Sequence, residues 1–432
     1  MQLPPHFFEN SCKVDVCSIT GASAFFLGIK DAVVIINGSK FCFLQMLHRL
    51  QKSFLKPVKN RIFCTNIKEN GIIYGNEENI KKVLTHIMTE LTPSVICLQN
   101  NCATSLIGDD LEGIISEFNF SCPVVIMDSG GIQGTFQDGF NKAALQFFSS
   151  IKIECHRNNN KNAINLLGAS EAFYNYRYDI KEIKKLLALG HIEVLHYIPD
   201  EIDIDDLQNL TTSSLNVVLY PELGKKTAEF LKEKYNIPYL LLDLPYGLKG
   251  SYQWIVSIMR ALKIEEKRIV QVRSYFDNCR SRILLETSKL EEEHGSIWID
   301  EVLLSGPLSV VSGLSKALGQ EFLNYNTMKL FVHSMQDIGK SEETSYDTIL
   351  SEFSVEKILN KNTTFLFGSL NEHAQILQRS TSGTIGYCCI AFPSNDYVSL
   401  GPYMGLGGIR NLLMCLWNYY ISNLYSQVLK PL

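Results

Sequence analysis

The sequence predicts an α/β protein made of three Rossmann-like domains, in which parallel sheets are flanked by helices. Two observations support this prediction. Apolar runs of strand length alternate with segments of helical length along the chain, an alternation that is typical of parallel sheets. The alternation falls into three series, and an asparagine-rich stretch at residues 158–162 forms a polar linker after the first. We therefore place the domains at residues 1–158, 159–292 and 293–432.

The first series begins with an apolar region that ends in a predicted buried strand at residues 31–37. A helix follows at residues 41–55, because its leucines recur on one side. Asn70-Gly71 is expected to be a turn, and a helix is expected at residues 77–91. The other predicted elements are strands from residue 94 and at 123–128, a glycine-rich loop at 129–134, and a helix at 136–149.

The second and third series repeat the pattern. The second has predicted strands at 163–168, 192–198, 215–220 and 239–243, with helices at 180–189 and 224–235. Residues 250–293 are expected to be helical and to lead to strands at 297–304, 328–333, 364–368 and 386–392, before a glycine-rich loop and a closing helix at 409–428. None of the series has a clean Gly-x-Gly-x-x-Gly followed by an acidic residue about twenty positions later, so a nicotinamide cofactor is not favoured.

The composition is that of an ordinary globular protein, with 46% hydrophobic and 20% charged residues. A net charge of −5 does not favour nucleic-acid binding. The first residues lack the layout of a signal peptide, and the most continuous apolar run, at 412–421, is too short to span a bilayer. We therefore expect no nucleic-acid partner, no membrane association and a cytoplasmic location.

The chain has 12 cysteines, which we expect to be thiols or metal ligands rather than disulfides in the absence of a secretion signal. Those inside apolar runs, such as Cys97, Cys388, Cys389 and Cys415, are predicted to be core residues. The sequence contains no Cys-x-x-Cys pair and no ferredoxin-type run. A cluster would therefore have to be assembled from distant loops.

Three other cysteines lie where an apolar run passes into a loop, and we predict that they form one iron–sulfur site. Cys102 follows the strand that begins at residue 94, at the carboxyl end where open α/β sheets place their ligands. Cys17 and Cys42 lie in similar contexts. Cysteine thiolates are soft ligands that suit iron. The alternative is that Cys17, Cys42 and Cys102 are core thiols.

Residues near these cysteines allow simpler interpretations. We expect Asp109 and Asp110 to act as helix N-terminal charges rather than as catalytic groups. The Gly130-Gly131 loop is either a tight turn or a place where backbone approaches a cluster. His196 and His333 lie in apolar strands and are expected to be core residues rather than ligands.

The motifs around the three cysteines resemble those of component 1 subunits of nitrogenase and nitrogenase-like reductases. Cys17-Ser-Ile-Thr-Gly-Ala22 is similar to the family's Cys-x-Pro-x-Gly-Ala, with Ile19 in the place of proline. Asn37-Gly-Ser-Lys-Phe-Cys42 resembles His-Gly-x-x-Gly-Cys. The most specific match is Cys102-Ala-Thr-Ser-Leu-Ile-Gly-Asp-Asp, which is close to the family's Cys-x-x-x-x-Ile-Gly-Asp-Asp.

This resemblance implies that Cys17, Cys42 and Cys102 bind an iron–sulfur cluster, either a four-iron cubane (4Fe–4S) or an eight-iron P-cluster type. It also implies that a homologous second subunit, or a second copy of the chain, shares the cluster. An ATP-dependent Fe-protein-like reductase would supply the electrons, in a complex such as a heterotetramer that can carry a second complex iron–sulfur cofactor.

The resemblance is weakest where the catalytic α subunit of nitrogenase holds its iron–molybdenum cofactor. The cofactor's cysteine falls near Tyr220 and its histidine at Met404. A nearby histidine falls at Asn141, although Gln137 matches a family glutamine. Dinitrogen reduction at a cofactor held by this chain is therefore not expected.

The sequence thus favours a subunit of a nitrogenase-like, ATP-dependent reductase that relays low-potential electrons through an interfacial cluster. By resemblance, its substrate class could be C–S bonds of small thioethers, tetrapyrrole rings, or dinitrogen with a partner. The alternatives are a scaffold for assembling a nitrogenase-type cofactor and a family member without a cluster that serves an interaction role.

Overall fold

The computed structural model describes residues 16–154, 160–332, 348–350, 363–379, 384–390 and 401–428. By its internal contacts the chain divides into two compact units. Residues 15–173 and 194–241 form one, here called the cysteine unit, and residues 1–14, 174–193 and 242–432 form the other, here called the C-terminal unit. His333 lies outside the described residues.

The first sheet of the cysteine unit has the strand order β2-β1-β3-β4 and is parallel throughout. Its central strands β1 and β3 are buried at every position, as expected when helices cover both faces of a parallel sheet. The strands are β1 (Val33–Asn37), β2 (Ile62–Cys64), β3 (Ile96–Asn100) and β4 (Val124–Asp128).

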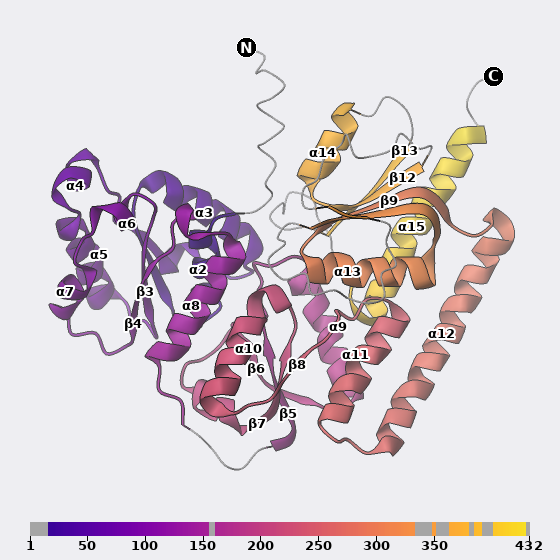
Figure 1. The fold of residues 1–432 in the computed structure, drawn as a ribbon, viewed down its shortest axis with the longest axis horizontal. Coiled ribbons are helices and arrows are strands. Elements are labelled where there is room, and N and C mark those ends of the chain that lie inside the picture. The colour runs from indigo at the N-terminus through magenta and orange to yellow at the C-terminus, as the bar shows by residue number, and fades with distance from the viewer. Residues whose placement is uncertain are drawn as a thin grey trace. The chain divides into compact units, whose positions relative to one another are not determined.

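Helices surround this sheet (Figure 1). Leu84 and Ile87 of α5 pack with Leu98 of β3 and with Leu111 and Ile114 of α7 in one core cluster. The helices are α2 (Ser18–Leu27), α3 (Lys40–Ser53), η1 (Lys59–Arg61), α4 (Glu69–Tyr74), α5 (Glu77–Glu90), α6 (Thr104–Ile107), α7 (Leu111–Ser116), η2 (Gly131–Gln133) and α8 (Phe136–Ser150).

Two of these helices differ from the sequence prediction. All ten residues of α2 are buried, so the sequence shows no polar face from which a helix could be recognised. α2 packs against α8 through glycines, since a Cβ on Gly21 would lie 1.8 Å from the carbonyl oxygen of Phe136. Asn70-Gly71, predicted as a turn, lies inside α4, which ends at Gly75 with φ +91°.

The second sheet of the cysteine unit has the order β6-β5-β7-β8. β5 starts at Asn160, inside the predicted linker, because Asn160 pairs with Ser213 of β7 even though the first three residues of β5 are exposed. The elements are β5 (Asn160–Leu167), β6 (Glu193–Ile198), η3 (Asp206–Thr212), β7 (Ser213–Val218), α10 (Pro221–Tyr235) and β8 (Tyr239–Leu241).

The C-terminal unit contains a five-stranded sheet of order β11-β10-β9-β12-β13, whose pairs are all parallel. Its strands are β9 (Trp298–Gly306), β10 (Asn324–Val332), β11 (Thr348–Leu350), β12 (Thr363–Gly368) and β13 (Thr384–Cys389). The helical stretch expected at residues 250–293 is two helices. These two are α11 (Gly247–Ala261) and α12 (Glu266–His294). The other helices of this unit are α9 (Tyr176–Leu189), α13 (Leu308–Ala317), η4 (Leu318–Phe322), α14 (Leu370–Arg379) and α15 (Gly405–Val428).

Three parallel sheets flanked by helices confirm the predicted fold class. The three-domain boundaries at residues 158 and 292 stay a prediction. None of the helices in the described part of the chain is both long enough and apolar enough to cross a membrane.

Candidate metal centre

Three segments at the carboxyl edge of the first sheet carry the predicted site cysteines. Cys17 is the N-cap residue of α2. Cys42 lies in the first turn of α3, which follows β1, and Cys102 comes two residues after β3. Because parallel strands share one carboxyl edge, loops that are distant in sequence meet there.

The glycine-rich loop after β4 lies directly against Cys102. The backbone N–H of Gly131 donates a hydrogen bond to Cys102 Sγ at 3.0 Å. A Cβ added at Gly131 would lie 3.4 Å from Cys17 Cβ and 3.8 Å from Cys102 Sγ. Cys17 also pairs with Thr135 in an isolated β-bridge. This loop therefore brings backbone close to two of the cysteines, and its approach to a cluster stays a prediction.

The three thiols are close enough to influence one another. Burial raises the pKa of the Cys17 thiol, the backbone N–H groups of Ile19 and Thr20 oppose that rise, and the Cys102 and Cys42 thiols add to it. A bound metal would replace the thiol protons and remove the cost of holding these sulfurs together as thiolates.

The starts of α2 and α3 carry two of the cysteines. Cys17 is the N-cap residue of α2 and Cys42 lies in the first turn of α3, where backbone N–H groups lack partners within the helix. The Ser39 side chain caps α3 by accepting a hydrogen bond from the Cys42 N–H at 3.5 Å. These helix starts suit metal-bound thiolates. Cys17 and Ser39 are also the N-cap residues of α2 and α3.

A fourth cysteine at this edge was not included in the predicted site. Cys64 is the last residue of β2, and the Cys42 thiol contributes to raising the pKa of Cys64, after the larger effect of burial. In the sequence Cys64 looks like any cysteine in a short apolar run. The register of β2 against β1, which the sequence does not show, places it here.

A buried polar network lies beneath the cysteine loops. Asn37 donates from Nδ2 to Asn100 Oδ1 at 2.9 Å, and its Oδ1 accepts from Thr65 Oγ1 at 2.9 Å and from Asn76 Nδ2 at 2.8 Å. Asn100 donates in turn to Asp128 Oδ1 at 3.0 Å. Asn37 thus joins the ends of three strands to the start of α5.

Asp110 acts at a helix N-terminus, as expected from the sequence, whereas Asp109 bonds a different segment. Asp110 caps α7 by accepting a hydrogen bond from the Gly113 N–H at 2.9 Å. Asp109 accepts one from the Asn76 N–H at 3.0 Å. Asp110 thus holds the start of α7, and Asp109 ties the segment after α6 to the start of α5.

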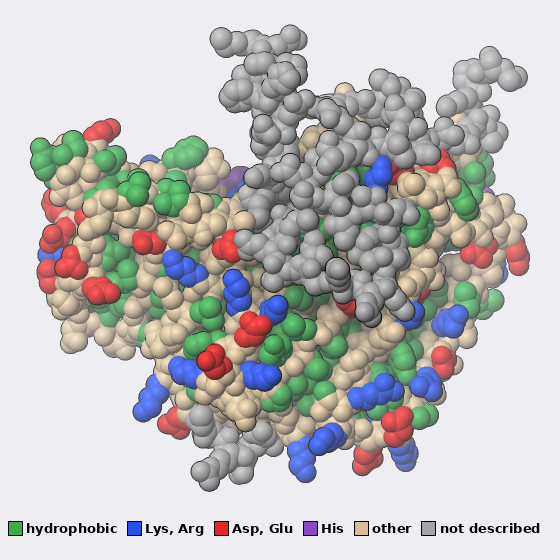
Figure 2. Space-filling view, viewed as in Figure 1, with side chains coloured by type: hydrophobic (Ala, Val, Ile, Leu, Met, Phe, Trp, Pro, Cys, Tyr) green, Lys and Arg blue, Asp and Glu red, His purple; other side chains and the backbone are tan. Residues whose placement is uncertain are grey.

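Large apolar side chains surround this edge and point to solvent. They are Phe41, Leu44, Ile72, Ile73, Tyr74, Leu106 and Ile132, here called the apolar rim, and their exposed fractions run from 49% for Leu44 to 86% for Tyr74. They belong to α3, α4, α6 and η2, the elements that follow the four strand ends. Figure 2 shows hydrophobic side chains gathered where Figure 1 places α4 and α6. An exposed apolar surface of this kind indicates a protein interface.

Three buried residues occupy the positions where the resemblance places the family's cofactor ligands and the nearby histidine. In the cysteine unit, Tyr220 is fully buried, with its ring 4.9 Å from that of Phe173. Asn141 is also buried, and its Nδ2 donates to the carbonyl oxygens of Gln137 and Glu222. In the C-terminal unit Met404 is fully buried.

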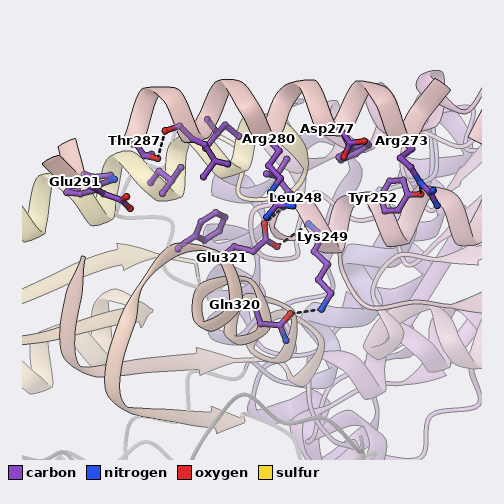
Figure 3. A pocket seen from close by; sticks show the side chains of 16 residues that line it. Leu248, Lys249, Tyr252, Arg273, Asp277, Arg280, Thr287, Glu291, Gln320 and Glu321 are labelled. Atoms are coloured by element: carbon purple, nitrogen blue, oxygen red, sulfur yellow. Dashed lines mark hydrogen bonds between the residues drawn. The ribbon is translucent and has the colours of Figure 1, made fainter. Parts of the chain in front are cut away.

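A cleft of about 750 Å³ in the C-terminal unit has a different character (Figure 3). Its lining cations Lys249, Arg273 and Arg280 are matched by the carboxylates of Asp277, Glu291 and Glu321. Glu321 is turned toward the start of α11, where the Leu248 and Lys249 N–H groups donate to it at 2.7 and 3.1 Å. Burial raises the pKa of Glu321, and these contacts oppose that rise. Because none of the described residues that line the cleft is a cysteine, the cleft offers no thiolate for an iron–sulfur cluster.

The cysteine edge fits a cluster better than a single ion. Among the described residues no three His, Cys, Asp or Glu side chains converge tightly enough to hold one metal ion. A cluster is wider than an ion and needs sulfur ligands that are farther apart. Soft thiol donors, N–H groups directed at sulfur and a glycine between Cys17 and Cys102 suit an iron–sulfur group.

The fold and this edge define a three-sheet α/β protein with a cysteine-lined site. Residues 17–285 match the family model described as nitrogenase component 1 type oxidoreductase. Because the match covers more than half of the chain, the chain belongs to this family. The predicted family and the prediction of an oxidoreductase-type subunit are thereby confirmed.

Individual relatives agree with this assignment. The nitrogenase iron-molybdenum cofactor biosynthesis protein NifE of Clostridium pasteurianum is 24% identical over 280 residues, which cover 64% of this chain and 58% of that protein. The nitrogenase molybdenum-iron protein alpha chain of Methanothermococcus thermolithotrophicus is 23% identical over 297 residues, which cover 66% of this chain and 62% of that protein.

A solved structure described as nitrogenase Cp1 at pH 6.5 has the same fold. Its TM-score is 0.74 at 18% identity, with 95% of this chain and 93% of that chain covered. The sequence matches to the two curated relatives span less than two thirds of their length. The activity, cofactor and partners of this chain are therefore matters for proposal.

Proposed function

We propose that this chain is a subunit of a nitrogenase-like, ATP-dependent reductase complex. It relays low-potential electrons through an iron–sulfur cluster bound by Cys17, Cys42 and Cys102. The observation that carries the proposal is the meeting of three cysteine-bearing segments at one sheet edge, where Gly131 N lies 3.0 Å from Cys102 Sγ. Family membership supplies the reaction type.

The apolar rim supports a partner at the same edge. Three cysteines leave one iron of a four-iron cluster without a protein ligand. The exposed rim would be costly to leave in water, so a homologous second chain or a second copy of this chain covers it. An Fe-protein-like reductase docks on that assembly and delivers electrons, and the complex works in the cytoplasm.

The buried residues at the positions that align with the family's cofactor site support an electron-relay role for this chain. Tyr220 is fully buried against Phe173, and Asn141 is held by two backbone carbonyls. Neither side chain offers a thiolate or imidazole to a second cofactor. The substrate-reducing cofactor, if the complex has one, is therefore held by the partner chain.

A scaffold for cofactor assembly is the second candidate. The specific observation in its favour is the similarity to a nitrogenase iron-molybdenum cofactor biosynthesis protein. A scaffold would hold a cofactor that can be transferred to an apo-nitrogenase. A reductase subunit would instead support ATP-dependent substrate reduction with its partner.

Anaerobic purification with iron and sulfide analysis and low-temperature EPR tests the cluster. The wild-type chain, with whatever chain co-purifies, is expected to contain iron and sulfide in cluster amounts. Cys102→Ala should lose most of that iron and the EPR signal. Cys122→Ala is the matched control, because Cys122 is half-buried in the same unit but precedes β4, at the opposite edge of the sheet. Folded wild-type protein without iron, or unchanged iron in Cys102→Ala, would contradict the proposal.

A further inference from the structure

A groove between α9, α12 and the start of α15 lies wholly within the C-terminal unit. Its volume is about 600 Å³, and pockets of roughly 300–1,000 Å³ are typical of small-molecule sites. The three helices that line it are distant in the sequence, so the packing of this unit creates the groove. The groove is therefore a candidate ligand site that has no part in the cysteine edge.

Positive charge distinguishes this groove from the cleft in Figure 3. In that cleft three cations face three carboxylates, whereas Glu182 is the one carboxylate among the described residues that line the groove. The cations that line the groove, here called the cationic groove, are Lys185 of α9, Arg268 and Arg282 of α12, and Arg410 of α15.

The carboxylate of Glu182 is already engaged by other groups. Its Oε1 accepts a hydrogen bond from Lys185 Nζ at 2.6 Å, and its Oε2 accepts one from the Gly407 N–H at 2.8 Å. Glu182 and Lys185 thus balance each other. The three arginines are left without a carboxylate partner among the described residues that line the groove.

The arginines have unused hydrogen-bond donors. Within the described part of the chain, Arg282 makes no hydrogen bond and no ion pair. Arg268 Nη1 donates to Gln271 Oε1 at 2.9 Å, but Arg268 Nε is buried without a hydrogen-bond partner. Arg410 has one exposed ion pair, with Nη2 3.4 Å from Glu286 Oε1. Because a buried N–H without a partner is unfavourable, an acceptor in the groove would be stabilising.

Apolar side chains form the remaining wall of the groove. Leu186 and Leu189 line it from α9, Ile283 from α12 and Leu406 from α15. Tyr275 is 43% exposed and adds an aromatic ring. An apolar wall with a few convergent charged groups is the usual construction of a small-molecule site. The groove thus has one part that suits an apolar body and one part that attracts an anion.

Arginine selects the chemical group that the groove would hold. A guanidinium presents its N–H groups in a planar fork that matches the two oxygens of a carboxylate or phosphate. We propose that the cationic groove binds a small organic anion. Its three arginines hold the carboxylate or phosphate group, and an apolar or aromatic body packs against Tyr275 and the apolar wall. This site goes beyond the proposed function and does not need the iron–sulfur cluster.

Matched probes test the charge and the apolar body separately. Phenyl phosphate and phenylacetate carry the two anionic groups on the same ring, phenylethanol lacks the charge, and inorganic phosphate lacks the ring. Isothermal titration calorimetry with the full chain in low-salt Tris buffer measures each affinity. At least one aromatic anion should bind with a Kd of about 1 mM or lower, and more tightly than phenylethanol and inorganic phosphate. The tighter aromatic anion identifies the anionic group that the site prefers.

Variants of α12 locate the binding. Arg282→Gln should weaken binding of the tighter anion by about tenfold or more, the usual loss for a charge-assisted hydrogen bond. Lys267→Gln is the matched control, because it removes one positive charge from an exposed position of the same helix that does not line the groove. Circular dichroism checks folding, and if Arg282→Gln does not fold, Arg268→Gln decides.

Four results would overturn the proposal. The Kd values of both aromatic anions lie above about 1 mM. The folded arginine variant binds as tightly as the wild type, which places the binding elsewhere. Lys267→Gln loses as much affinity as the arginine variant, which reduces the effect to general charge. Inorganic phosphate or phenylethanol binds as tightly as the aromatic anions. Absence of iron from the chain would contradict the proposed function without affecting any of these measurements.

Discussion

Replacing Gly130 with alanine should disturb the backbone that carries Cys102. A Cβ at Gly130 would lie 2.5 Å from Cys102 N, 2.8 Å from Cys102 Cα and 2.9 Å from the carbonyl carbon of Asn101. All three atoms are backbone and cannot rotate away. At Gly131, by contrast, an added Cβ would meet its nearest neighbour, Cys17 Cβ, at 3.4 Å.

The size of the effect follows from these distances. The loop after β4 must move by roughly 0.5–1 Å to reach ordinary contact, and such overpacking costs about 1–3 kcal/mol. The movement also strains the bond from Ser129 N–H to the Asn100 carbonyl, 3.2 Å long, which is worth about 1 kcal/mol. We expect Gly130→Ala to lower the free energy of unfolding by about 2–4 kcal/mol. Gly131→Ala should change it by about 0.5 kcal/mol or less.

Urea unfolding of the metal-free chain, followed by circular dichroism, measures this difference without relying on a cluster. Iron content after anaerobic purification is the second readout, and it should fall in Gly130→Ala because Cys102 is displaced. The reasoning is refuted if Gly130→Ala is as stable as the wild type, or if Gly131→Ala is destabilised to the same extent.

Three further predictions concern buried polar groups and thiols. Asn37→Ala should lower the free energy of unfolding by about 2–4 kcal/mol, because it leaves several buried partners unpaired, and it should also lower the iron content. The control Asn165→Ala removes a buried asparagine of the second sheet and should be destabilising without loss of iron. Equal iron content in the two variants would contradict this prediction. Burial raises the pKa of Asp179 to about 7, so between about pH 4 and 7 the folded chain binds more protons than the unfolded chain and stability falls as the pH rises. In urea unfolding measured from pH 5 to 8, Asp179→Asn should reduce the fall of the unfolding free energy with rising pH. An unchanged pH dependence would contradict the raised pKa of Asp179. The hydrogen bond with Cys388 lowers the pKa of Cys415 to about 7. Cys388→Ala should therefore move the pH midpoint of Cys415 alkylation to higher pH. An unchanged midpoint would show that this hydrogen bond is not what lowers the pKa.

Much of the first sheet could be predicted because its strands are continuous apolar runs. Val33–Asn37 and Ile96–Asn100 are buried at every position, and such runs are typical of parallel strands covered on both sides. α2 could not be predicted in this way, since a helix that is buried all round lacks the 3.6-residue alternation of polar and apolar residues. Asn70-Gly71 misled the prediction because this pair is common in turns, whereas here it lies in the first turn of the short helix α4.

The sequence alone determined the fold class, the family resemblance, and the position of Cys17, Cys42 and Cys102 beside apolar runs. These properties depend on local pattern, which is written in the order of residues. The tertiary structure decided that Cys64 joins the same edge, since its position depends on the register of β2 against β1. It also decided that Gly130 rather than Gly131 lies in tight contact with the Cys102 backbone, and that Tyr220 packs against Phe173. Contacts between residues far apart in the chain arise from packing, and no local pattern in the sequence specifies them.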